Sequence, residues 1–115
     1  MELVRNEEKR AEYTKRAKEL VSKMTLEEKV QQTLYQAPAI ERLGIKAYNW
    51  WNEALHGVAR AGVATVFPQA IGLAATFDED LAEEVAEAVS MEGRAKFNMQ
   101  QEYDDTDIYK GLTFW

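Results

Sequence analysis

The first part of the chain alternates apolar and charged positions with the spacing of a helix. Asn6 is placed to cap this helix, and Glu7 and Glu8 fall in its positively polarised first turn. Positions three and four apart share one apolar face, which consists of Tyr13, Ala17, Leu20, Val21 and Met24. The pattern predicts an amphipathic helix that ends near residue 24.

A capping box follows at once. Thr25 stands three positions before Glu28, the arrangement in which each side chain bonds the other residue's backbone N–H. A second helix is therefore expected from Leu26 to Pro38, because proline cannot continue a helix. Its apolar stripe is Leu26, Val30, Leu34 and Ala37.

The middle of the chain is poor in charge and rich in turn residues. Leu43-Gly44-Ile45 indicates a turn into a short extended piece. Residues 64–67 are β-branched or aromatic, end at Pro68, and predict a short buried strand. The apolar run 69–75 predicts one short helix.

A long helix is expected after a cap at Thr76 or Asp78. Its apolar face is Leu81, Val85, Ala88, Val89 and Ala95, and seven acids within 78–92 fall mostly on the solvated side. Gly93 lies inside this helix and should cost about 1 kcal/mol relative to alanine. Residues 100–107 predict a loop, and 111–115 predict a second strand that ends on Trp115.

These elements indicate the opening of a larger α/β fold. A strand, a long helix and a second strand form a parallel unit, and two parallel strands cannot cover both of their own faces. Domains rarely end inside an apolar strand. Residues 1–115 are therefore expected to be one piece of a larger domain.

Composition excludes several classes of partner and site. The net charge is −6 and there is no cysteine. Nucleic acid is not an expected partner, because phosphate binding needs clustered Lys and Arg. No apolar run is long enough to span a membrane, and the charged N-terminus is no signal peptide, which favours a cytoplasmic location. We expect no cofactor and no metal site.

Three familiar motifs fail. The glycines of 57–62 have the spacing of a phosphate loop, but the following Lys-Ser/Thr is missing. Ser22 and Ser90 lie on predicted helices far from the only histidine in sequence, which argues against a serine–histidine–carboxylate triad. The aspartates of 104–107 lack the spacing and glycine of a calcium loop.

The stretch 48–57, Tyr-Asn-Trp-Trp-Asn-Glu-Ala-Leu-His-Gly, is the candidate site. It sets Glu53 and His56 beside Trp51 and Asn52. Aromatic faces stack on the C–H face of a sugar ring, and a carboxylate accepts hydrogen bonds from neighbouring hydroxyls. The same residues also fit a packed tryptophan pair, a satisfied acid and a structural histidine.

This stretch, continued through Val58-Ala59-Arg60 and the run 65–77, resembles the N-terminal region of glycoside hydrolase family 3. Residues 24–30 and 111–115 extend the match, in the family's order. The resemblance implies a retaining, exo-acting β-glycosidase with a (β/α)8 TIM-type barrel, of which this α/β chain is the helix-rich, incomplete N-terminal portion. The partner implied is an oligosaccharide substrate.

The resemblance also assigns site residues. Glu53 matches the acid that hydrogen-bonds sugar hydroxyls, and Trp51, Asn52 and His56 are weaker candidates as wall or supporting residues. The Glu-Ala-Leu-His-Gly version resembles the β-xylosidase branch, since β-glucosidase relatives often carry Asp at the acidic position. The family's nucleophile and acid/base belong to segments absent from this chain, so no residue here is assigned as catalytic.

Two other interpretations remain open at this level. The chain fits a stand-alone acidic helical interaction module, or a non-catalytic sugar-binding remnant that uses Glu53 and the tryptophans. As a part of a barrel, it is expected to hydrolyse nothing alone and to self-associate through exposed strand edges and apolar surface.

Overall fold

The structure, a computed structural model, describes residues 7–114. Helices dominate it, and η marks a 3-10 helix. The elements in order are α1 (Glu7–Ser22), α2 (Leu26–Gln31), β1 (Gln36–Ala37), η1 (Glu41–Leu43), β2 (Tyr48–Asn49), η2 (Ala59–Ala61), α3 (Ala70–Ala74) and α4 (Glu79–Gln101). The predicted cap Asn6 and the terminal Trp115 lie outside the described residues.

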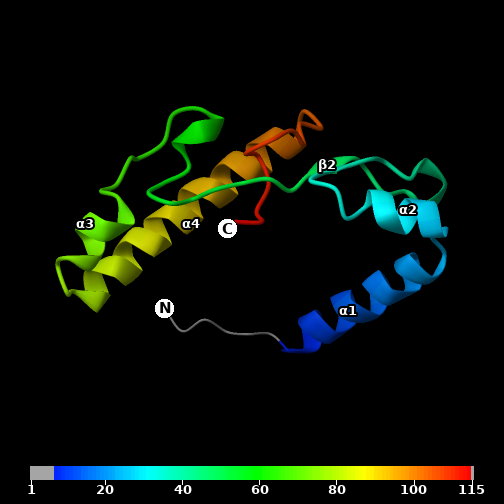
Figure 1. Ribbon diagram of the computed structural model, residues 1–115, viewed down its shortest axis with the longest axis horizontal. Helices are drawn as coiled ribbons and strands as arrows, with labels where there is room; N and C mark the ends of the chain where they lie inside the picture. Colours follow the sequence, from blue (N-terminus) through cyan, green and yellow to red (C-terminus); the bar gives the residue numbers. More distant parts are fainter. Residues whose placement is uncertain (1–6, 115) are drawn as a thin grey trace.

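The first predicted helix is confirmed, but none of the described residues buries its apolar face. α1 buries none of its residues, and Tyr13 keeps 60% of its surface exposed. Figure 1 shows α1 projecting away from the other elements and joined to them through α2. The amphipathic pattern therefore forms the helix without fixing what the helix packs against.

The second helix begins as predicted and ends early. Thr25 and Glu28 form the complete capping box, but α2 stops at Gln31 and the predicted extension to Pro38 is wrong. Proline disfavours helical geometry in the residue before it, and Ala37 is accordingly extended. β1 pairs antiparallel with β2, with Ala37 opposite Tyr48. The turn at Leu43-Gly44 is confirmed, with Gly44 left-handed at φ +65°.

The predicted strand 64–67 does not form. Val66 is 65% exposed rather than buried. The backbone N–H groups of this segment bond to two different parts of the molecule and not to one neighbouring strand. Thr65 N–H donates to the Glu92 carboxylate at 3.2 Å, and Phe67 N–H donates to the His56 carbonyl at 2.8 Å. A single strand is not stable without a ladder partner, and no second strand lies beside it within residues 7–114.

Residues 111–114 do not form the predicted second strand either, so the parallel strand–helix–strand unit is absent from the described chain. The Leu112 N–H donates instead to the Tyr48 hydroxyl at 3.3 Å. A Cβ on Gly111 would lie 2.1 Å from that hydroxyl oxygen. Only glycine allows this close approach of the C-terminal segment to β2.

The helix α4 is the platform of the fold. Its cap at Asp78 is confirmed, since the carboxylate accepts from the Leu81 N–H at 2.9 Å. The helix runs to Gln101, slightly past the predicted loop boundary. The short helix expected in 69–75 is confirmed as α3. Figure 1 shows the loop from β2 to α3 running alongside α4.

Three residues of α4 hold neighbouring segments against it. The Glu92 carboxylate accepts from the Thr65 hydroxyl at 2.7 Å, and Lys96 Nζ donates to the Ala61 carbonyl at 3.1 Å. Gly93 is buried, and a Cβ there would lie 3.2 Å from Cζ of Phe114. The view of Gly93 as a weak point is therefore incomplete, because its missing side chain lets Phe114 reach the helix.

The core is small. In the described chain, Ala37, Ile40 and Val58 are the buried hydrophobic side chains, and no side chain is less than 2% exposed. The radius of gyration is 16.9 Å, against roughly 13 Å for a compact domain of this length. No helix of the described chain is long and apolar enough to cross a bilayer.

Candidate functional site

The stretch 48–57 leaves β2 as an irregular loop, and the segment 106–111 braces it. The Asn49 N–H donates to the Thr106 carbonyl at 3.0 Å, and the Tyr109 N–H donates to the Trp51 carbonyl at 3.0 Å. Asn52 Nδ2 donates to the Gly111 carbonyl at 2.7 Å. Three bonds between segments distant in sequence therefore fix the backbone that carries the candidate residues.

Asn52 is the most buried polar side chain of the described site, at 3% exposure. Besides the bond to Gly111, its Oδ1 accepts from the Glu53 N–H at 3.0 Å. Buried amides need such partners, because an unmet hydrogen-bonding group away from water costs free energy. Asn52 therefore supports the backbone of Glu53 with both polar atoms of its side chain engaged.

Trp51 lies two residues after β2 and forms an aromatic pair with Tyr35. Its ring lies 5.6 Å from the Tyr35 ring at 73°, an edge-to-face contact of the kind that stabilises aromatic pairs. The backbone N–H of Trp51 donates to Asn49 Oδ1 at 3.0 Å. The indole is half-buried, so part of its surface remains open to a ligand.

Glu53 is half-buried and faces a cation. Its Oε2 lies 3.7 Å from Arg60 Nη1, and the carboxylate side chain keeps 29% of its surface exposed. Arg60 Nη2 donates to the Tyr109 hydroxyl at 2.9 Å, and its Cζ lies 4.6 Å from the centroid of that ring. Glu53 therefore belongs to a charged and aromatic cluster with Arg60 and Tyr109.

His56 belongs to a different neighbourhood. Its Nδ1 lies 3.1 Å from the Phe67 carbonyl, and its carbonyl accepts the Phe67 N–H, so the two residues are tied twice. Gly57 follows with φ +126°, and a Cβ there would lie 2.3 Å from the Thr65 carbonyl oxygen. This hairpin-like contact holds the histidine against the loop before α3.

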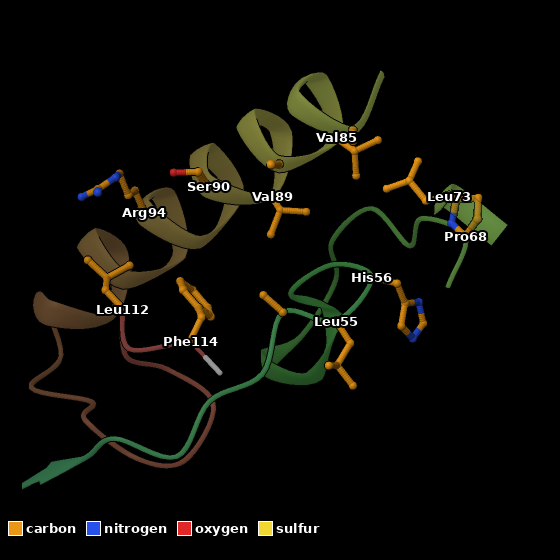
Figure 2. A pocket seen from close by; sticks show the side chains of 13 residues that line it. Leu55, His56, Pro68, Leu73, Val85, Val89, Ser90, Arg94, Leu112 and Phe114 are labelled. Atoms are coloured by element: carbon orange, nitrogen blue, oxygen red, sulfur yellow. The ribbon is translucent and has the colours of Figure 1, made fainter. Parts of the chain in front are cut away.

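An apolar cavity of about 410 Å³ opens between this loop, α3, α4 and the C-terminal segment. Figure 2 shows Val85 and Val89 of α4 facing the loop that carries Leu55 and His56. The residues around the cavity are mostly aliphatic, and the charged Arg94 also lines it. Glu53, Trp51 and Asn52 are not among them.

The structure therefore divides the predicted set of site residues. Trp51, Asn52 and Glu53 lie together on the braced loop beside Arg60, whereas His56 lines the cavity. Sequence reasoning missed Arg60 and Tyr109 as parts of the site. Arg60 had a signal, because it is one of only five charged residues between positions 30 and 77 and comes seven places after Glu53.

One carboxyl group near the site, in its bracing segment, has a shifted pKa. Lys110 Nζ donates to Asp105 Oδ2 at 2.5 Å, and this hydrogen bond holds the pKa of Asp105 below its ordinary value of 3.8. The pair closes a short loop around Tyr109. Within residues 7–114, no group of three or more His, Cys, Asp or Glu side chains is arranged to hold a metal ion.

Several proteins named as β-xylosidases are similar to nearly all of this chain. A probable exo-1,4-beta-xylosidase (xlnD) of Neosartorya fischeri is 50% identical over an alignment of 115 residues, which covers 90% of this chain and 14% of that protein. One of Aspergillus oryzae (bxlB) is 52% identical over an alignment of 111 residues, which covers 87% of this chain and 13% of that protein.

The similarity extends to a plant. A probable beta-D-xylosidase 7 of Arabidopsis thaliana is 43% identical over an alignment of 111 residues, which covers 88% of this chain and 14% of that protein. No protein-family model matches the chain, and no solved structure matches it. The chain is thus related to proteins named as β-xylosidases and spans about 14% of the length of those relatives.

Proposed function

We propose that this chain is the N-terminal part of the catalytic domain of a retaining, exo-acting β-glycosidase of glycoside hydrolase family 3. The whole protein would remove single sugars from the non-reducing ends of xylo- or gluco-oligosaccharides, with β-xylosides favoured. The chain would open a (β/α)8 barrel whose remaining strands and helices come from further residues. Identity of 50% with a protein named as a xylosidase carries this proposal.

The local geometry agrees with a sugar-binding role for the braced loop. Glu53 offers a half-buried carboxylate two residues after the half-buried Trp51. A carboxylate held at a partly dry surface accepts short, charge-assisted hydrogen bonds from hydroxyls. An indole provides an apolar face for the C–H side of a pyranose. Glu53 and Trp51 would together hold the sugar in the position where cleavage occurs.

Glu53 would bind the sugar and not attack it. Retaining hydrolysis needs two carboxylates about 5 Å apart, one as nucleophile and one as acid/base. Both are proposed to come from outside this chain. The isolated chain of 115 residues should therefore release no nitrophenol from 4-nitrophenyl β-xyloside, and measurable turnover by the pure chain would contradict this assignment.

A chimaera tests the proposed function directly. In this full-length protein, named the Aspergillus chimaera, the chain replaces the matching segment of the Aspergillus oryzae relative, with which it shares 52% identity. The expected result is hydrolysis of 4-nitrophenyl β-xyloside, with the unchanged relative assayed as the reference. A folded chimaera that hydrolyses neither aryl β-xylosides nor aryl β-glucosides, beside an active reference, would overturn the proposal.

The preference for xylosides has a proposed cause in the length of Glu53. Its extra methylene, compared with aspartate, would occupy space that the hydroxymethyl group of a hexose needs, and specificity is often built by excluding the competitor. Glu53→Asp in the Aspergillus chimaera should raise the ratio of glucoside to xyloside hydrolysis. An unchanged ratio would refute this explanation of the preference.

A further inference from the structure

Arg60 is exposed, yet two contacts with one side chain hold its guanidinium. Its Nη2 donates to the Tyr109 hydroxyl at 2.9 Å, and its Cζ stands 4.6 Å from the centre of the same ring. A free arginine at a surface loses rotamer entropy whenever it is held in one place. The cation–π contact and the hydrogen bond together offset that loss.

Tyr109 is itself fixed to the loop that carries Glu53. Its N–H donates to the Trp51 carbonyl at 3.0 Å, and its backbone adopts φ +65°. A residue other than glycine stays in this left-handed region only where its surroundings hold it there. Contacts therefore link Glu53 to Arg60, Arg60 to Tyr109, and Tyr109 back to Trp51 on the loop that carries Glu53.

The contact between Arg60 and Glu53 leaves the carboxylate available. The Nη1–Oε2 distance of 3.7 Å makes an ion pair but is too long for a hydrogen bond. Within residues 7–114, no hydrogen-bond donor is engaged by either carboxylate oxygen of Glu53. Among the described residues its lone pairs stay available to an incoming donor, and the nearby cation favours carboxylate orientations that face the guanidinium.

We propose that Arg60, clamped by Tyr109, is a positioning residue that orients the Glu53 carboxylate toward the hydroxyl groups of a bound sugar. This inference rests on the proposed function, in which Glu53 binds the sugar. Arg60 acts through Glu53 and need not touch the substrate. Tyr109 acts one step further out, through Arg60.

A double-mutant cycle in the Aspergillus chimaera tests this order of action. Glu53→Gln should raise KM for 4-nitrophenyl β-xyloside by about 10- to 100-fold, the value of a hydrogen bond to a charged group. Arg60→Gln should raise KM roughly two- to fivefold, the range of a partly exposed ion pair. The double variant should match Glu53→Gln alone, because Arg60 has nothing left to position.

Two further variants separate positioning from general damage. Arg60→Lys keeps the charge without the planar fork and should recover part of the loss. Arg42→Gln removes a second exposed arginine–glutamate pair, with Glu28, and should leave KM unchanged. Multiplicative effects of Glu53→Gln and Arg60→Gln on KM would overturn the inference, and so would an equal rise of KM in Arg42→Gln.

The outcomes distinguish the two proposals. An inactive, folded chimaera overturns the proposed function and this inference with it, whereas an active chimaera with multiplicative effects overturns this inference alone. The clamp is also tested in the chain of 115 residues by proton NMR. The Arg60 side-chain protons should be shifted by the Tyr109 ring, with the shift kept in Tyr109→Phe and lost in Tyr109→Leu. Arg60 side-chain protons with the same chemical shifts in all three proteins would contradict the clamp.

Discussion

Several glycines of this chain matter because their missing side chains let another segment approach closely. Gly111 admits the Tyr48 hydroxyl, Gly57 admits the Thr65 carbonyl, and Gly93 admits the Phe114 ring. Asn52 works in the opposite way, by filling a buried place with an amide whose two ends are both bonded. The site loop is held in place by partners such as the Gly111 carbonyl, which lies 59 positions along the chain from Asn52.

Removal of the Asn52 amide should destabilise the fold. Asn52→Ala leaves the Gly111 carbonyl and the Glu53 N–H without their partners at a buried place, which costs about 1–3 kcal/mol. Urea unfolding measures the loss. Asn98→Ala, at an exposed position of α4, is the matched control and should change stability by only a few tenths of a kcal/mol. Equal effects of the two changes would contradict the bracing role of Asn52.

Gly93→Ala should not give the stabilisation that helix propensity alone promises. Alanine is worth about 1 kcal/mol more than glycine inside a helix, but the new Cβ would lie 3.2 Å from Phe114 Cζ. The gain should appear in full only when Phe114→Ala removes the ring. Unfolding free energies of the two single variants and the double variant check this. A full gain with Phe114 present would show that the ring does not depend on Gly93.

At the level of elements, short-range signals predicted well and long-range pairing did not. The capping box at Thr25 and the cap at Asp78 each depend on residues three positions apart, so they are visible in the sequence. The expected strand at 64–67 depends on a neighbour, and its β-branched composition cannot supply one. Likewise, the motif around Glu53 was recognisable, whereas its contact with Arg60 and Tyr109 requires the fold.

The junction between α1 and α2 should lose stability in acid. The hydrogen bond from Arg42 is the first cause, and that from the Thr25 backbone the second, of a Glu28 pKa below its ordinary value of 4.5. A carboxylate with a lowered pKa stabilises the fold above its unfolded pKa and stops doing so as pH falls through the folded pKa. The pair therefore contributes fully near neutral pH.

Arg42→Gln tests this dependence. The difference in unfolding free energy between the parent chain and Arg42→Gln should be present at neutral pH and shrink as pH falls below 4.5. Arg16→Gln, at an exposed arginine of α1, is the control and should show no such trend. A difference for Arg42→Gln that stays constant down to low pH would contradict the assigned role of the pair.

Across the described residues, the molecule exposes much apolar surface. Its radius of gyration exceeds that of a compact domain, and large hydrophobic side chains are exposed on several elements. Val63, Phe77, Ile71 and Leu26 keep 99%, 95%, 81% and 78% of their surfaces exposed. Exposed apolar surface on this scale marks an interaction site or an aggregation liability. This agrees with a chain that spans 14% of the length of a relative.

The chain alone should therefore self-associate. Sedimentation velocity should show a concentration-dependent increase in mass. Val30→Lys, on the 58%-exposed valine of α2, should reduce it more than Thr14→Lys on exposed α1. A monodisperse monomer at all concentrations would contradict this expectation.

The most direct test concerns Glu53 in the setting of a complete enzyme. The value of kcat/KM for 4-nitrophenyl β-xyloside is compared between the Aspergillus chimaera and its Glu53→Gln variant. Equal unfolding temperatures of the two proteins show that the substitution leaves the fold intact. Loss of charge-assisted hydrogen bonds to the sugar should lower kcat/KM at least about tenfold. An active chimaera whose kcat/KM does not change with Glu53→Gln would contradict the assignment of Glu53 as the sugar-binding acid.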